Sequence, residues 1–290
     1  MTRVFWVQDF YSVAMSQVLR RRLGLPGRAA GAALRRVEAR LIRDSDAVVV
    51  ISEDFEPTLA KWRVEPERVR VIENWAPVEE LTPRPRDNEW SRANGLSGKR
   101  VALYAGTIGL KHDPGLLLEL AAAAGADDDI RIVVISQGPG REWLEGRRRE
   151  QHADNLVLLD YQPYEAFPEV LAAADLLLTL LEPDAGRFSV PSKVLSNLCA
   201  GRAQLVAVPA ENLAARTIER SGGGVVVDPR DRRRFVDAGV RLLGDEELCR
   251  GLGERGRAFA EEHFRIGHVT DRFEAVLAGA VENRRVTSSS

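Results

Sequence analysis

Two loops of this chain place glycines beside positively charged side chains, the combination that a site for phosphate or another anion needs. The first loop spans residues 104–114 (YAGTIGLKHDP), follows a β-branched run, and ends in an Asp-Pro pair typical of a helix start. Gly106 and Gly109 allow the backbone to approach a ligand, and Lys111 can supply a point charge to a diphosphate. Considered alone, the loop is explained equally well as an ordinary strand-to-helix turn with a solvated lysine.

The second loop spans residues 186–193 (GRFSVPSK) and precedes a short helix that ends before Gly201. Free N–H groups at such a helix start, with Ser192 and Lys193 beside them, predict a second anion site. Arg187 is able to add a bidentate clamp on phosphate oxygens. A helix of this length needs a cap in any case, so a purely structural role stays open. Two such loops in one predicted sheet favour anion binding.

The elements that must position these loops form an alternating pattern. Six short β-branched runs alternate with helical patterns between residues 101 and 229, which predicts a doubly wound parallel sheet of the α/β class. The predicted strands are 101–105, 130–135, 156–159, 176–181, 205–208 and 225–227. Ligands of such a sheet bind at the carboxyl ends of the strands, where both loops fall.

The first part of the chain predicts a second Rossmann-like domain that is incomplete. Strand-like runs occur at 4–7, 47–51 and 69–72, with helical patterns at 30–43 and 53–62. A doubly wound domain normally needs about a hundred residues or more, and fewer precede the expected linker. One explanation is a truncated gene product.

The expected linker is a stretch that is rich in proline and charge and lacks hydrophobic periodicity. The predicted division of the chain is a partial first domain at 1–76, the linker at 77–98, a complete second domain at 99–265, a helix packing back toward the first domain at 266–283, and a disordered tail at 284–290.

Composition excludes several classes of protein. The formal net charge of −2 gives no support to a nucleic-acid partner. Cys199 and Cys249 cannot make a disulfide framework and lack metal-ligand spacing, which suits a reducing compartment. The longest apolar stretch, residues 170–181, contains Asp175 and is too short to span a bilayer, and no export signal opens the chain. These features predict a cytoplasmic protein.

The segment from residue 20 to residue 43 is strongly basic. Its arginines are Arg20, Arg21, Arg22, Arg28, Arg35, Arg36, Arg40 and Arg43. Apolar residues at helical spacing accompany them: Leu23, Leu34, Val37, Leu41 and Ile42. One interpretation is a patch that meets anionic lipid headgroups at the inner face of the cell membrane. A solvated helix face is the simpler interpretation.

Several motifs, in their order and spacing, resemble the retaining, sugar-nucleotide-dependent glycosyltransferases of the GT-B fold, the type called glycosyl transferases group 1. These motifs are residues 6–9 (WVQD), 47–52, 72–75 (IENW), 104–106 (YAG), 137–140 (QGPG), 191–193 (PSK) and 200–202 (AGR). The resemblance covers nearly the whole chain. The Asn-Trp and Pro-Ser-Lys versions are most similar to the branch that builds bacterial surface polysaccharides, including transferases of fucosamine-type sugars.

The resemblance implies that the second domain binds a nucleoside-diphosphate sugar and the first binds a glycan or lipid-linked acceptor. The implied donor-binding residues are Gly106, Thr107, Gly109, Gly138, Tyr161, Arg187, Pro191, Ser192 and Ser196. Catalytic roles fall on Asp9, Lys111 and Lys193, while Gln8 and Asn74 face the acceptor side. Asp9 is also consistent with a turn or cap residue. No metal ion or other cofactor is expected, because the lysines and helix amides meet the charge on the leaving phosphate.

The chain departs from the family pattern at positions that bear on donor binding. Many relatives carry two glutamates separated by seven residues, and the corresponding positions here are Phe188 and Ser196. Thr107 stands where many relatives have arginine. The identity of the donor therefore stays open.

Two alternatives to a glycosyltransferase remain at this stage. One is a donor-binding module without catalysis of its own. The other is a sugar-nucleotide epimerase of the same architecture, which the histidine and carboxylate content of the loops disfavours.

Overall fold

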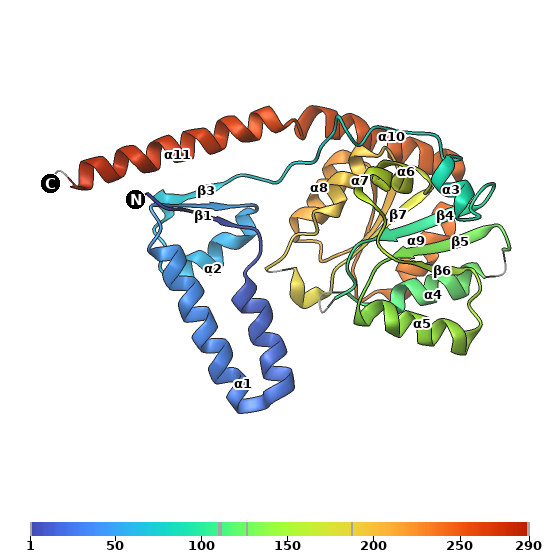
Figure 1. Cartoon of the computed structure of the whole chain (residues 1–290), viewed down its shortest axis with the longest axis horizontal. Coiled ribbons are helices and arrows are strands. Elements are labelled where there is room, and N and C mark those ends of the chain that lie inside the picture. Colours follow the sequence, from blue (N-terminus) through green and yellow to red (C-terminus); the bar gives the residue numbers. More distant parts are fainter. Residues whose placement is uncertain (1, 110–111, 126, 187, 289–290) are drawn as a thin grey trace. The chain divides into compact units, whose positions relative to one another are not determined.

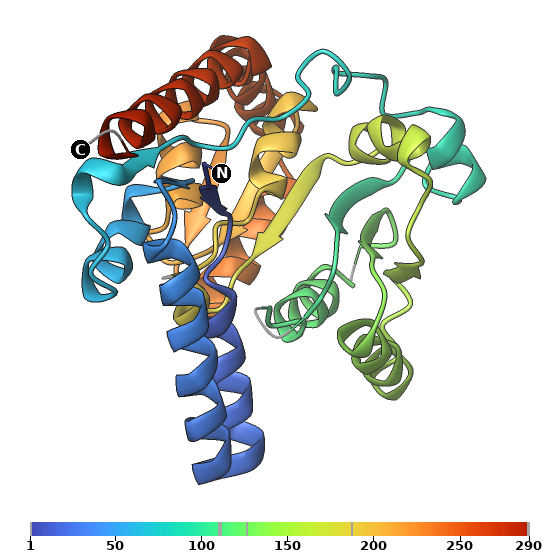
Figure 2. The ribbon, with the colours of Figure 1, turned by 60° about the vertical axis from the view of Figure 1, so that its left-hand side comes forward.

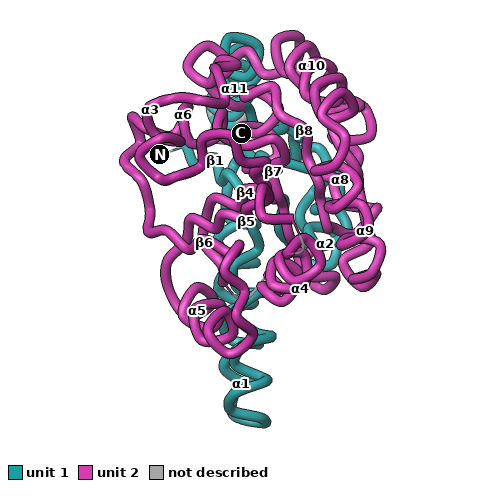
Figure 3. Tube along the Cα trace, turned by 90° about the vertical axis from the view of Figure 1, so that its right-hand side faces the viewer, with its two compact units in different colours: residues 1–75, 187–190, 266–290 teal, residues 76–186, 191–265 magenta. Residues whose placement is uncertain are grey.

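A computed structural model of the protein describes residues 2–109, 112–125, 127–186 and 188–288. The chain folds as two compact units, coloured separately in Figure 3. Unit 1 contains the described residues of 1–75, 187–190 and 266–290, and unit 2 contains those of 76–186 and 191–265.

Unit 2 is built on a six-stranded parallel sheet. Its strands are β4 (Arg100–Ala105), β5 (Ile130–Ile135), β6 (Leu156–Leu159), β7 (Leu176–Leu180), β8 (Ala203–Ala207) and β9 (Gly224–Val227). They lie in the order β6-β5-β4-β7-β8-β9, the arrangement of a doubly wound nucleotide-binding sheet. All six strands predicted from the sequence are confirmed to within two residues.

Helices cover both faces of this sheet (Figures 1 and 2). They are α3 (Glu89–Ala93), α4 (Gly115–Ala124), α5 (Pro139–Gln151), α6 (Phe167–Ala172), α7 (Lys193–Cys199), α8 (Leu213–Ser221), α9 (Arg232–Leu243) and α10 (Glu246–His263). Helix α4 packs against α5 and α9, whereas α10 packs against α7, α8 and β8. The core beneath α4 and α9 includes the fully buried side chains of Leu120 and Phe235.

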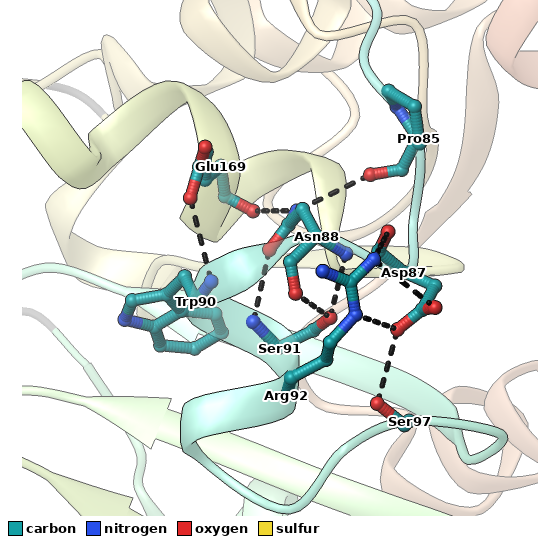
Figure 4. A network of polar contacts seen from close by, with 8 residues as sticks. All are labelled: Pro85, Asp87, Asn88, Trp90, Ser91, Arg92, Ser97 and Glu169. Carbon is teal, nitrogen blue, oxygen red and sulfur yellow. Dashed lines mark hydrogen bonds and ion pairs between the residues drawn. The ribbon is translucent and has the colours of Figure 1, made fainter.

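Residues 77–98, the expected linker, are instead an ordered part of unit 2. Helix α3 begins in a reciprocal capping box, in which the side chains of Asn88 and Ser91 each accept the other residue's backbone N–H at 2.9 Å (Figure 4). The Asn88 side chain also donates to the carbonyl oxygen of Glu169 at 2.9 Å. The sequence lacked periodicity here because this short helix is held by polar contacts rather than by an apolar stripe.

Replacing Asn88 with alanine is expected to lower the free energy of unfolding by about 1–2 kcal/mol, because the N-cap bond is lost. The carbonyl of Glu169 would lose its donor as well. Urea unfolding measures the change, and Asn94→Ala, which removes one bond to the carbonyl of Trp90 at the other end of α3, is the control. Equal losses in the two variants would contradict a special role for the cap.

Unit 1 holds a three-stranded parallel sheet in the order β1-β2-β3. Its strands are β1 (Val4–Val7), β2 (Ala47–Val50) and β3 (Val69–Val71), and the short helix α2 (Glu56–Lys61) follows β2. The three strand-like runs of the sequence are thus confirmed as strands. The central strand β2 is buried along its whole length.

Helix α1 (Tyr11–Arg43) is longer than the sequence pattern predicted and breaks at Gly24, whose φ is 61°. Two antiparallel arms result, which project together from the sheet of unit 1 (Figures 1 and 2). The first arm was missed because its buried positions include the small polar residues Ser12 and Ser16 rather than an apolar stripe. A Cβ at Gly31 would lie 2.8 Å from the Ser16 hydroxyl, so glycine allows the arms to approach.

Helix α11 (Ile266–Ser288) packs on the sheet of unit 1 and is longer than expected. The ring of Phe273 lies edge-on to Trp6 with ring centroids 5.0 Å apart. Arg284, placed in a disordered tail by the sequence, is helical and forms an ion pair with Asp46 at 3.0 Å. Residues 289–290 lie outside the described part.

Candidate functional site

The strand order of unit 2 reverses at the centre of the sheet. Strands β4 and β7 are neighbours, but the chain runs outward from β4 in one direction and from β7 in the other. Ligands of doubly wound sheets bind at this reversal point, outside the carboxyl ends of the strands. The loop after β4 and the loop between β7 and α7 therefore flank the candidate site.

Lys193, the first residue of α7, turns its amine toward the loop after β4. Part of its side chain is exposed, yet Nζ is buried and has no hydrogen-bond partner among the described residues. Nζ lies 3.6 Å from the centre of the Tyr104 ring, a cation–π arrangement. Burial lowers the pKa of Lys193 from 10.5 to about 7. A buried amine without an acceptor is costly, and an anionic ligand would relieve that cost.

Gly106 leaves the space that this amine occupies. Its φ is 136°, a conformation that side-chain-bearing residues rarely adopt, and a Cβ there would lie 3.0 Å from Lys193 Nζ. Gly106 and Lys193, two residues that the resemblance assigns to the site, therefore lie next to each other.

If the loop binds the nucleotide sugar that the resemblance implies, the variant Gly106→Ala is expected to weaken that binding about tenfold, because the new methyl group displaces the amine and strains the loop. Calorimetric titration measures the affinity. Gly98→Ala is the matched control, since Gly98 also has a positive φ of 74° but a methyl group added there would have no atom within 4 Å. Loss of stability in both variants with unchanged affinity would remove Gly106 from the site.

Three side chains fix the loop after β4. The buried Tyr104 hydroxyl donates to the carbonyl oxygen of Thr107 at 3.0 Å, and burial raises the pKa of Tyr104. The Thr107 hydroxyl lies 2.6 Å from the hydroxyl of Tyr161, which follows β6 and is half exposed. Ser136, directly after β5, accepts from the N–H of Ile108 at 3.1 Å. The structure thus brings Thr107 and Tyr161 together.

Tyr104 and Ser136 were not identified as site residues from the sequence. In the sequence, Tyr104 is indistinguishable from the other buried residues of its strand. In the structure, β4 pairs with β7, and the Tyr104 ring lies beneath the Lys193 amine. Ser136 had a weak signal, because it is the first polar residue after a predicted strand.

Two backbone N–H groups at the start of α7, predicted to be free, have partners in the structure. The N–H groups of Val194 and Leu195 donate to the carbonyl oxygens of Pro191 and Ser192 at 3.3 and 3.0 Å, so they are not free for an anion. Tight turns at the start of a short helix satisfy these donors locally. An anion bound here would meet the Lys193 amine rather than those two amides.

The other predicted donor residues are distributed around the same loops. Ser192 is exposed, and Ser196 lies partly buried one turn into α7. Gly138 is the N-cap of α5 with a φ of 88°, and the Gly109 N–H is engaged by His112 Nδ1 at 3.1 Å. Two further predicted cations, Lys111 and Arg187, lie outside the described residues.

The predicted acceptor residues belong to unit 1. Gln8 follows β1 and Asn74 follows β3, and their amides pair reciprocally at 3.1 and 2.8 Å. Asp9 is exposed beside Gln8. Gln8 and Asn74 are thus brought together in one unit, while Gly106 and Lys193 are brought together in the other.

No group of three or more His, Cys, Asp or Glu side chains within the described ranges is arranged to hold a metal ion.

Comparison with known proteins gives consistent matches over both units. A glycosyl transferase 4-like domain matches residues 1–75, and the glycosyl transferases group 1 family matches residues 86–259. The probable glycosyltransferase WbjE of Pseudomonas aeruginosa is 25% identical over 264 residues, which are 87% of this chain and 63% of WbjE. N-acetyl-alpha-D-glucosaminyl L-malate synthase of Bacillus anthracis is 25% identical over 51% of this chain and 37% of its own length. The chain thus spans less than two thirds of these relatives.

Solved structures share the fold. HepE of Anabaena, in complex with UDP, superposes with a TM-score of 0.76 at 14% identity, over 95% of this chain and 72% of HepE. WaaG, a glycosyltransferase involved in lipopolysaccharide biosynthesis, gives a TM-score of 0.69 at 17% identity, over 89% of this chain and 70% of WaaG. The predicted α/β fold of GT-B type is confirmed by these neighbours. Because the group 1 model matches more than half of the sequence, the chain belongs to the glycosyl transferases group 1 family.

Proposed function

We propose that the chain transfers a sugar from a nucleoside-diphosphate sugar to a hydroxyl of a glycan or lipid-linked acceptor, with retention of configuration. The observation that carries the proposal is the buried Lys193 amine, which lies beside Gly106 at the reversal point of the unit 2 sheet. This amine has no hydrogen-bond partner among the described residues. The diphosphate of a nucleotide sugar would supply the oxygen atoms to which the amine can donate hydrogen bonds.

A uridine diphosphate sugar is the first donor to test. The structural neighbour HepE was solved with UDP, with UDP and glucose, and with UDP-glucose. These complexes support a nucleotide-sugar donor, although at 14% identity they share the fold alone.

In the proposed reaction, the acceptor oxygen attacks the anomeric carbon from the face that the nucleoside diphosphate leaves. The bond between the anomeric carbon and the phosphate oxygen breaks as the new glycosidic bond forms. The leaving phosphate gains negative charge, and the proton of the acceptor hydroxyl passes to an oxygen of that phosphate. Protonated Lys193 stabilises that charge, and we assign Asp9 to polarising the acceptor hydroxyl. The proposal includes no metal ion.

The acceptor side of the proposal rests on unit 1 and on the relatives. Gln8 and Asn74 present a paired amide surface at the carboxyl ends of β1 and β3, where a sugar could be hydrogen-bonded. WaaG is involved in lipopolysaccharide biosynthesis. We therefore place the reaction in cell-envelope polysaccharide assembly, on the cytoplasmic side of the membrane.

The test is a titration of the purified chain with uridine, guanosine and thymidine diphosphate sugars, followed by calorimetry. Mass spectrometry with a polyprenyl-linked acceptor detects product in parallel. Binding with transfer supports the proposal. Binding without transfer to any acceptor would favour a donor-binding module, and absence of binding to all donors would contradict the assigned site.

A further inference from the structure

The hairpin of α1 has a charge unlike that of the rest of the molecule. Residues 11–37 contain six arginines and no aspartate or glutamate, while the whole chain has a net charge of −2. All side chains from residue 20 to residue 26 and from 28 to 30 are exposed. The positive charge therefore gathers at the hairpin tip, at the end remote from the sheet of unit 1 (Figures 1 and 2).

Large apolar side chains share this exposed tip. Leu23 and Leu25, on either side of the break at Gly24, are 56% and 76% exposed. On the second arm Leu34, Val37 and Leu41 follow helical spacing and are 39%, 58% and 50% exposed. Exposed apolar side chains next to a cluster of arginines are typical of surfaces that meet a partner.

The hairpin does not depend on these leucines for its own structure. Gly27 and Gly31 allow the arms to meet, because a Cβ at either would collide with Leu19 or Ser16. The Ser16 hydroxyl donates to the carbonyl oxygens of Ser12 and Gly31 at 2.6 and 3.0 Å. The exposed leucines are thus available for contacts outside the chain.

We propose that the tip of the α1 hairpin, residues 19–28, docks on a membrane surface that contains anionic lipid. Leu23 and Leu25 enter the interface between headgroups and acyl chains, and Arg20, Arg22 and Arg28 contact the lipid phosphates. Charge complementarity selects this partner, since the tip has cations, apolar side chains and no carboxylate. Within the described residues no helix is long and apolar enough to cross a bilayer, and the contact is interfacial.

The proposal is tested by co-sedimentation of the full chain with two kinds of vesicle, pure phosphatidylcholine and equal parts phosphatidylcholine and phosphatidylglycerol. Binding to the anionic vesicles alone, weakened by salt, is the expected result. Absence of binding, or equal binding to both kinds, would overturn the proposal, even if the chain associates with itself or with another protein.

Paired variants separate docking from folding. Arg20→Glu/Arg22→Glu is expected to lower vesicle affinity about tenfold or more, whereas Arg233→Glu/Arg234→Glu on exposed positions of α9 leaves it unchanged. Leu23→Ser/Leu25→Ser has its control in Ile266→Ser/Leu277→Ser, two residues of α11 that are 59% and 50% exposed. Circular dichroism and nucleotide-sugar affinity report whether each variant is folded. If the tip variants bind vesicles as the controls do, the hairpin is not the docking surface.

Discussion

Replacing Lys193 with methionine is expected to weaken nucleotide-sugar binding between about tenfold and about 150-fold while making the folded chain more stable. A hydrogen bond to a charged group contributes about 1.5–3 kcal/mol, and each 1.4 kcal/mol corresponds to about a factor of ten in affinity. The same amine is buried without an acceptor in the absence of ligand, so its removal relieves a cost to folding. Calorimetry measures the affinity and urea unfolding measures the stability.

The opposite signs of the two effects separate a binding role from a structural one. Lys99→Met is the control, because Lys99 lies in the same unit and forms an exposed ion pair with Asp129 at 2.8 Å. This control is expected to leave affinity unchanged and to alter stability by less than about 1 kcal/mol. A Lys193→Met chain that is less stable and binds the donor normally would show that the lysine serves the fold.

Donor affinity is expected to fall as the pH rises above about 7, by up to about tenfold per pH unit. The diphosphate favours the protonated amine, so it raises the pKa of Lys193 above its value of about 7 in the free protein. Below pH 7 the Lys193 amine of the free protein is already charged, and its affinity for the donor is highest. Above pH 7, donor binding requires that Lys193 takes up a proton, which lowers the affinity. A nucleotide sugar is the right ligand, because its diphosphate has no terminal ionisation in this range to obscure the effect.

The Lys193→Met chain supplies the control for this pH dependence, since its affinity is expected to stay flat over the same range. The pH dependence of the folding stability gives an independent check on the lowered pKa of Lys193. The unfolded chain binds a proton at Lys193 up to pH 10.5 and the folded chain only up to about 7, so the free energy of unfolding is expected to rise with pH between these values. A pH profile of affinity that is the same for both chains would contradict the role of Lys193.

The sheet of unit 2 could be predicted because its strands are short apolar runs rich in Val, Ile and Leu, largely buried on both faces, as at residues 130–135. The first arm of α1 could not, because its contact with the second arm depends on Ser12, Ser16 and two glycines rather than on apolar spacing. Helix α3 was not predicted from the sequence for a similar reason. Its stability comes from the Asn88 cap and a contact to Glu169, which is distant in the sequence.

The sequence indicated which loops form the candidate site, but not which of their polar groups are available to a ligand. Glycines and lysines after predicted strands indicated Gly106 and Lys193, and the two residues are indeed neighbours. The sequence could not show that the amides of Val194 and Leu195 are engaged by nearby carbonyls. Nor could it show that the Lys193 amine lies over the ring of Tyr104, because this contact depends on the pairing of two strands far apart in the chain.

The most direct test of the Lys193 site is a titration of the lysine side-chain signals by nuclear magnetic resonance. The chain has four lysines, so four signals are expected, and Lys193→Met identifies one of them by its loss. We predict that this signal titrates with a pKa of about 7 in the free protein and that a UDP-sugar shifts its pKa upward. A signal that titrates near 10.5, the ordinary lysine value, and does not respond to any nucleotide sugar would contradict the assignment of Lys193 as the donor-binding cation.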